Sequence, residues 1–145
     1  MKTLSIEEHA DKEPKANTIT YVKSVMLEVK EADNMMAVYL NVDNDHGPNS
    51  SIAYHHHMNG FGARVVLNDS INITPLLGQI PEDFDKYIKA ENRNDILTLV
   101  CSNFESFGKF DFILRIDGDE DKSFAFCGTI EPHHTHQFNF WMVKQ

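Results

Sequence analysis

Three consecutive segments near the C-terminus each carry a pair of phenylalanines separated by one residue. Alternate residues of a β-strand project from the same face, so each pair places two large apolar rings on one side of its strand. Aromatic side chains bury a large apolar area, and we therefore interpret the pairs as core contacts between neighbouring strands. The pairs are Phe110 and Phe112, Phe124 and Phe126, and Phe138 and Phe140.

Paired aromatic residues also occur in proteins that stack single-stranded nucleic acid on a sheet, but those platforms surround the rings with Lys and Arg. Here the neighbouring residues include Asp111, Asp117 and Glu131. The whole chain has 22 Asp and Glu against 13 Lys and Arg, a formal net charge of −9. A field of this sign repels phosphate backbones and anionic membranes. We therefore expect neither as a direct partner, and a basic protein partner fits the charge better.

Alternation of apolar and polar residues predicts strands along most of the chain. The first two strands are expected to pair as a hairpin across the polar residues 31–34. Asn59-Gly60 is expected to form the turn of a later hairpin. The predicted strands cover residues 18–30, 35–42, 52–58, 61–68, 95–102, 109–117, 122–131 and 136–144.

One short helix is predicted from Pro81, which suits the first helical position and is followed by acidic residues at the positive end of the helix dipole. The predicted fold is mainly β, of the α+β type: an antiparallel β-sandwich or strongly curved sheet of seven to eight strands with one short helix. A single domain is expected over residues 1–145, with residues 1–16 as a loosely held N-terminal arm.

The composition indicates a protein of the cytoplasm. The first 17 residues lack the apolar core of a secretion signal, and no stretch approaches the roughly 18 apolar residues of a membrane span. Cys101 and Cys127 belong to no C-x-x-C pair, and we interpret both as small buried core residues.

The run DGDEDK at residues 117–122 concentrates carboxylates between two predicted strands. It begins like a calcium loop but has Lys122 where the loop needs Gly, and Gly128 where it needs Glu. We interpret the run as an acidic hairpin turn that can contact Lys and Arg of a partner. With the carboxylates of the predicted helix start, the candidate partner-binding residues are Asp117, Asp119, Glu120, Asp121, Glu82, Asp83 and Asp85.

Six of the eight histidines fall in two groups, at 55–57 and at 133, 134 and 136. On a strand, His55 with His57 and His134 with His136 would each form a pair on one face. If the two strands were adjacent, four nitrogens would converge, giving a metal-binding module or a metal-dependent enzyme as the alternative. Glu131 is the nearest carboxylate, and no H-E-x-x-H spacing is present. Our main expectation is histidines with ordinary hydrogen bonds or in an interface, and no metal or other cofactor.

No nucleophile elbow, phosphate loop or dinucleotide fingerprint occurs, so we expect a protein that is not an enzyme. Its small size, acidity, β-rich pattern and the stretches DGDED (117–121) and PEDFD (81–85) resemble the bacterial immunity proteins of contact-dependent growth inhibition and related systems. The resemblance implies a tight one-to-one complex that neutralises a cognate basic toxin, such as a nuclease. It transfers no residue role. A further alternative is a β-sandwich that binds a small ligand, which requires a sizeable cavity.

Overall fold

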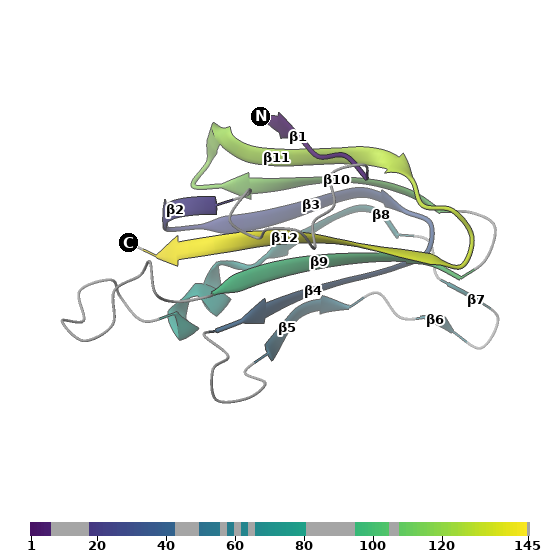
Figure 1. Cartoon of the computed structure of the whole chain (residues 1–145), viewed down its shortest axis with the longest axis horizontal. Helices are drawn as coiled ribbons and strands as arrows, with labels where there is room; N and C mark the ends of the chain where they lie inside the picture. Colours follow the sequence, from purple (N-terminus) through teal and green to yellow (C-terminus); the bar gives the residue numbers. More distant parts are fainter. Residues whose placement is uncertain are drawn as a thin grey trace.

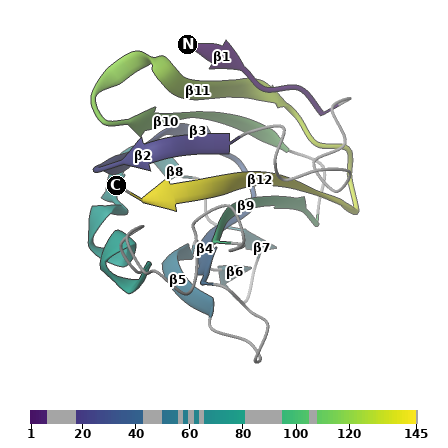
Figure 2. The ribbon, with the colours of Figure 1, turned by 60° about the vertical axis from the view of Figure 1, so that its left-hand side comes forward.

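The computed structural model describes residues 1–6, 18–42, 50–55, 58–59, 62–63, 66–80, 95–104 and 108–144, and in these ranges the chain forms a β-sandwich. Two open five-stranded sheets face each other, as Figures 1 and 2 show. The first sheet has the strand order β1 (Lys2–Thr3), β11 (Asp119–Thr129), β10 (Lys109–Ile116), β3 (Val25–Ala32) and β8 (Val66–Asn72). The second sheet has the order β2 (Thr18–Val22), β12 (His134–Lys144), β9 (Ile96–Asn103), β4 (Met35–Asn41) and β5 (Ser50–His55). The predicted fold class is therefore confirmed.

The phenylalanine pairs form the centre of the core, as their alternation predicts. Rings of the first sheet meet rings of the second: Phe112 lies 5.6 Å from Phe138, and Phe124 lies 4.8 Å from Phe140, both edge to face. Phe126 also contacts Phe138, with ring centroids 4.9 Å apart. All of these rings are buried, so none is available to stack nucleic acid.

Neighbouring strands add aliphatic residues to the same core at alternate positions. The face of β3 that lies against the core carries Val25, Leu27 and Val29. In the other sheet, the equivalent positions are Met36, Val38 and Leu40 of β4 and Leu97, Leu99 and Cys101 of β9.

The expected hairpin between the first two predicted strands is wrong. Residues 18–30 do not form one strand, because the chain leaves the second sheet after β2 and enters the first sheet at β3. β4 then lies in the second sheet, so β3 and β4 never pair. The spacing of the buried residues Ile19 and Val22, three apart, breaks the period of two at this crossing. At the other corner the buried Asn34 turns the chain between β3 and β4, and its side-chain oxygen accepts hydrogen bonds from the N–H groups of Met35 and Phe104.

The remaining described elements lie at the edges. β1 pairs with β11 in parallel, and Leu4 after it is buried, so the N-terminal arm begins as an edge strand. A 3₁₀-helix, η3 (Thr74–Gln79), follows β8. The helix predicted from Pro81 lies outside the described residues. β6 (Met58–Asn59) and β7 (Gly62–Ala63) form a two-stranded ribbon in which Asn59 pairs with Gly62, so Asn59 is a strand residue, and Gly60 of the predicted turn lies outside the described residues. No helix in the described ranges has the length and apolar character needed to cross a membrane.

The two cysteines differ. Cys101 is buried in the core, as predicted, and its burial raises the pKa of the thiol. Cys127 is exposed, so the prediction is wrong for this residue. Because Phe124 and Phe126 face the core, the odd-numbered Cys127 points to the outer face of β11.

Candidate functional site

The acidic run at residues 117–121 is a tight hairpin turn, as expected. Ile116 pairs with Asp119, so the loop consists of Asp117 and Gly118 alone. Both have positive φ, 55° and 63°, the combination that matches the twist of two antiparallel strands. Asp tolerates this conformation better than most residues, and Gly tolerates it freely. The turn lies at the left-hand end of the sandwich in Figure 1, where β10 passes into β11.

Asp117 holds this turn against the rest of the molecule. Its Oδ1 accepts hydrogen bonds from the backbone N–H of Lys23 at 2.6 Å and of Ser24 at 2.8 Å. Its Oδ2 accepts one from the Lys122 ammonium at 2.5 Å. Partial burial alone would raise the pKa of Asp117, but these three hydrogen bonds outweigh it and lower the pKa below its usual value. Asp117 thus holds the turn in place, and both oxygens of its carboxylate already accept hydrogen bonds within the molecule.

Three carboxylates remain exposed on the tip: Asp119, Glu120 and Asp121, which we call the acidic tip. In the part of the chain that the structure describes, none of them is in an ion pair. By contrast, Glu28 of the first sheet is paired with Arg115 at 2.6 Å. The acidic tip therefore presents its negative charge from a rigid backbone. The other candidate partner-binding residues, Glu82, Asp83 and Asp85, lie outside the described residues.

The histidine groups are not on adjacent strands. His134 and His136 lie on β12 and His55 ends β5, with β9 and β4 between them. At the usual strand spacing, β5 and β12 are roughly 14 Å apart, too far for His55 to share one ion with His134 and His136. His57 lies outside the described residues. Among the side chains that are described, no three His, Cys, Asp or Glu residues are grouped to hold a metal.

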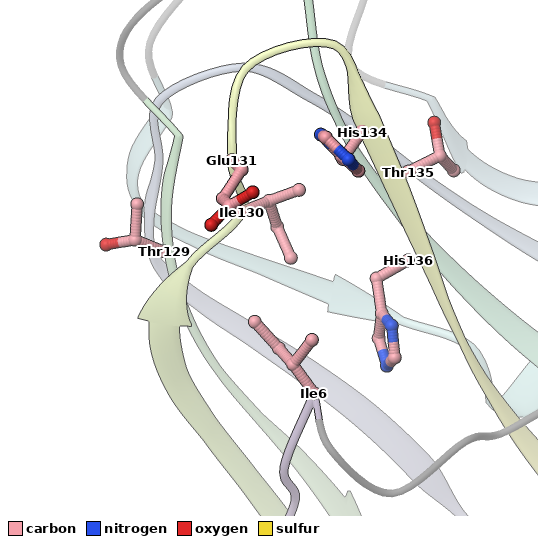
Figure 3. Close-up of a pocket in the computed structure, with 7 residues that line it drawn as sticks. All are labelled: Ile6, Thr129, Ile130, Glu131, His134, Thr135 and His136. Atoms are coloured by element: carbon pink, nitrogen blue, oxygen red, sulfur yellow. The ribbon is translucent and has the colours of Figure 1, made fainter.

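His134 and His136 instead line a pocket of about 330 Å³ at the end of the sandwich where β11 turns into β12. Figure 3 shows Glu131 on the connecting turn, His134 at the start of β12, His136 further along β12, and Ile6 of the N-terminal segment across from them. Ile130 lies between these groups. The lining residues of the described chain are Ile6, Thr129, Ile130, Glu131, His134, Thr135 and His136.

Two hydrogen bonds fix His134. Its backbone N–H donates to the Glu131 carbonyl at 3.1 Å, and its Nδ1 lies 2.9 Å from the Pro132 carbonyl oxygen. A carbonyl only accepts, so Nδ1 carries the proton and, in the neutral ring, Nε2 is an acceptor. His136 packs edge to face on Phe138, with ring centroids 4.6 Å apart.

A buried polar cluster supports the turn that carries the pocket. Asn103, at the end of β9, donates from its side-chain amide to the Ile130 carbonyl at 2.8 Å. Its own carbonyl accepts the N–H of His133 at 2.6 Å, and its Oδ1 accepts from Asn34 at 3.2 Å. The backbone carbonyl of Gly108 accepts a hydrogen bond from the N–H of Ile130 at 2.8 Å. Residues 130–134 are thereby tied to both sheets.

The sequence pattern singles out His134, His136 and Glu131, but it does not predict that Ile6 and Ile130 lie beside them in one pocket. Ile130 continues the even-numbered alternation of Phe124 and Phe126, and so its inward position follows from the pattern. Ile6 reaches the pocket because β1 pairs with β11. This long-range contact cannot be predicted from the sequence of β1, which consists of the two polar residues Lys2 and Thr3.

In comparisons with known proteins, no family model, no curated protein and no solved structure matches this chain.

Proposed function

We propose that the chain is a non-enzymatic, acidic binding protein that neutralises a basic partner. In its specific form, it is an immunity protein of the cytoplasm that inhibits a cognate nuclease toxin in a one-to-one complex. The observation that carries the proposal is the acidic tip: three exposed carboxylates on a hairpin whose backbone is locked by Asp117. A locked tip loses little conformational freedom when it binds, which favours a tight complex.

Charge supports the same class of partner. The described residues contain 11 Asp and Glu against seven Lys and Arg, so the part of the sandwich that the structure describes shares the acidity of the whole chain. A protein that grips RNA or DNA is basic, and an acidic inhibitor gains fast association and charge matching from its field. A metal-dependent function has less support, because β9 and β4 separate the two histidine strands.

The test is a pull-down with the product of the gene immediately upstream, since an antidote is expected to be encoded beside its toxin. We expect a one-to-one complex by light scattering, with association slowed as salt rises from 50 to 300 mM, on the order of tenfold or more. Glu120→Lys and Asp121→Lys are each expected to slow association by a similar factor.

Asp69→Lys is the matched control, since Asp69 is an exposed carboxylate of β8 outside the acidic tip and its reversal changes the net charge by the same amount. If Asp69→Lys slows association as much as the tip variants do, the contact is not at the acidic tip. If the purified chain binds no basic protein and instead converts a substrate, the proposed class is wrong.

A further inference from the structure

The pocket between β11 and β12 combines an apolar floor with hydrogen-bond acceptors. Ile130 is only 3% exposed and forms a closed wall, whereas Ile6 leaves 36% of its surface in contact with solvent. An aliphatic group in the pocket would cover this part of Ile6, which is a favourable burial of apolar surface. The volume of about 330 Å³ is at the lower end of the range for small-ligand sites.

The polar side of the pocket favours a positive charge. Glu131 supplies an exposed carboxylate, and the Nε2 of neutral His134 is an acceptor because Nδ1 donates to Pro132. Among the lining residues in the described ranges there is no Lys or Arg. Lys109, which pairs with the lining residue Thr129 in the sheet, has its ammonium 3.9 Å from the Glu31 carboxylate.

We infer that this pocket binds an alkyl cation, a primary ammonium or guanidinium group on a short aliphatic chain. The aliphatic part contacts Ile6 and Ile130, and the cationic end donates hydrogen bonds to the Glu131 carboxylate and to Nε2 of His134. A divalent metal fits less well, because no three candidate ligands are grouped among the described side chains. The group can come from a free amine or from a Lys or Arg side chain of a protein.

The pocket and the acidic tip lie at opposite ends of β11, whose 11 residues span roughly 30 Å. Binding in the pocket is therefore a separate property from the proposed toxin contact. Either can fail in experiment while the other holds.

The test is a titration of the ¹⁵N-labelled full chain with n-butylammonium, followed by NMR at about pH 8, above the ordinary titration range of an imidazole and below that of a primary amine. We expect shifts concentrated at residues 129–136 and saturable binding in the millimolar range, which is typical for so small a ligand. Butyrate and 1-butanol have nearly the same aliphatic chain without the positive charge, and each is expected to bind at least about tenfold more weakly.

Two variants test whether Glu131 gives the pocket its selectivity for a positively charged ligand. Glu131→Gln keeps the shape of the side chain and removes its charge, and it is expected to weaken n-butylammonium binding about tenfold. Glu120→Gln, the same change on the acidic tip, is expected to leave the affinity unchanged. Equal effects of the two variants, or butyrate binding as tight as n-butylammonium, would overturn the inference, as would Zn²⁺ saturating the site while the amine does not bind.

Two further ligands separate the sources of the cation. Cadaverine represents a free diamine, and Nα-acetyl-lysine methylamide represents a lysine side chain within a protein. Tighter binding of cadaverine supports a free amine, and tighter binding of the lysine derivative supports a protein side chain. If neither binds more tightly than 1-butanol, the assignment of an alkyl cation is wrong.

Discussion

Asp117 shows how one side chain decides whether an acidic run is a docking surface or a structural joint. It lies within the cluster DGDED, yet its two oxygens accept hydrogen bonds from Lys23, Ser24 and Lys122. Its side chain is only 15% exposed. The three donors belong to two segments that are distant in sequence, so Asp117 joins the β10–β11 hairpin to the crossing between β2 and β3.

Replacing Asp117 is expected to loosen this joint. Asp117→Ala leaves the N–H groups of Lys23 and Ser24 without their acceptor and removes a residue suited to positive φ, for a loss of about 2 kcal/mol in the free energy of unfolding at pH 7. Asp117→Asn keeps one oxygen acceptor and the turn preference but loses the charge and the acceptor for Lys122, so a smaller loss than for Asp117→Ala is expected. Urea unfolding of the three proteins at pH 7 measures both values.

The pH dependence of the same variants has a defined sign. The pKa of Asp117 is lower in the folded protein than in the unfolded chain, so its charge stabilises the fold above the unfolded pKa and that contribution is lost as the pH falls through the folded pKa. The difference in unfolding free energy between the native chain and Asp117→Asn should therefore shrink as the pH falls from about 5 to about 3. A difference that stays constant over this range would contradict the role of the ionised carboxylate.

At the scale of elements, the positions of the strands follow from alternation, but their assignment to a sheet does not. Both sheets bury one face against the same core, so β3 and β4 have the same apolar pattern although they never pair. The sheet to which each strand belongs is decided at the corners of the sandwich, where Asn34 contacts Asn103 and Asp117 contacts Lys23. The two residues of the first contact are separated by 69 positions in the sequence and those of the second by 94 positions, so no local pattern encodes either contact. The acidic tip lies within one hairpin and could be predicted from consecutive residues. The pocket could not, because it depends on the pairing of β1 with β11.

The end of the sandwich that carries the pocket depends on close approach at Gly108. A Cβ at this position would clash with the backbone oxygen of Ile130 and with the side-chain amide of Asn103. We expect Gly108→Ala to lower the free energy of unfolding by about 1–3 kcal/mol, because the backbone and the buried amide have little room to move. Thermal unfolding measures the loss.

Gly78→Ala in η3 is the matched control. A Cβ at Gly78 meets nothing within 4 Å, so the change should be close to neutral. NMR shifts of Gly108→Ala should extend to residues 130–134 through the bonds of Asn103. A Gly108→Ala protein as stable as Gly78→Ala would show that the contact is relieved at no cost.

At the scale of the whole molecule, the two sheets share one core and should lose their structure together. Phe138 of the second sheet contacts Phe112 and Phe126 of the first, so part of the stability of each sheet is supplied by the other. Phe138→Ala removes these ring contacts and leaves a cavity between the sheets, with an expected loss of about 3–5 kcal/mol. Phe138→Leu keeps most of the apolar volume and should lose less than half of that.

Native-state hydrogen exchange distinguishes a shared core from two independent sheets. The slowest amides of β10 and of β9 lie in different sheets, and a single cooperative unit predicts that they exchange with the same opening free energy in the native chain. Phe138→Ala, although it lies on β12, should lower both free energies by the same amount. If β10 kept its protection while β9 lost it, the sheets would open separately. The rings of Phe112 and Phe126 would then stabilise only their own sheet, and the acidic tip on β10 and β11 would remain folded when the second sheet is lost.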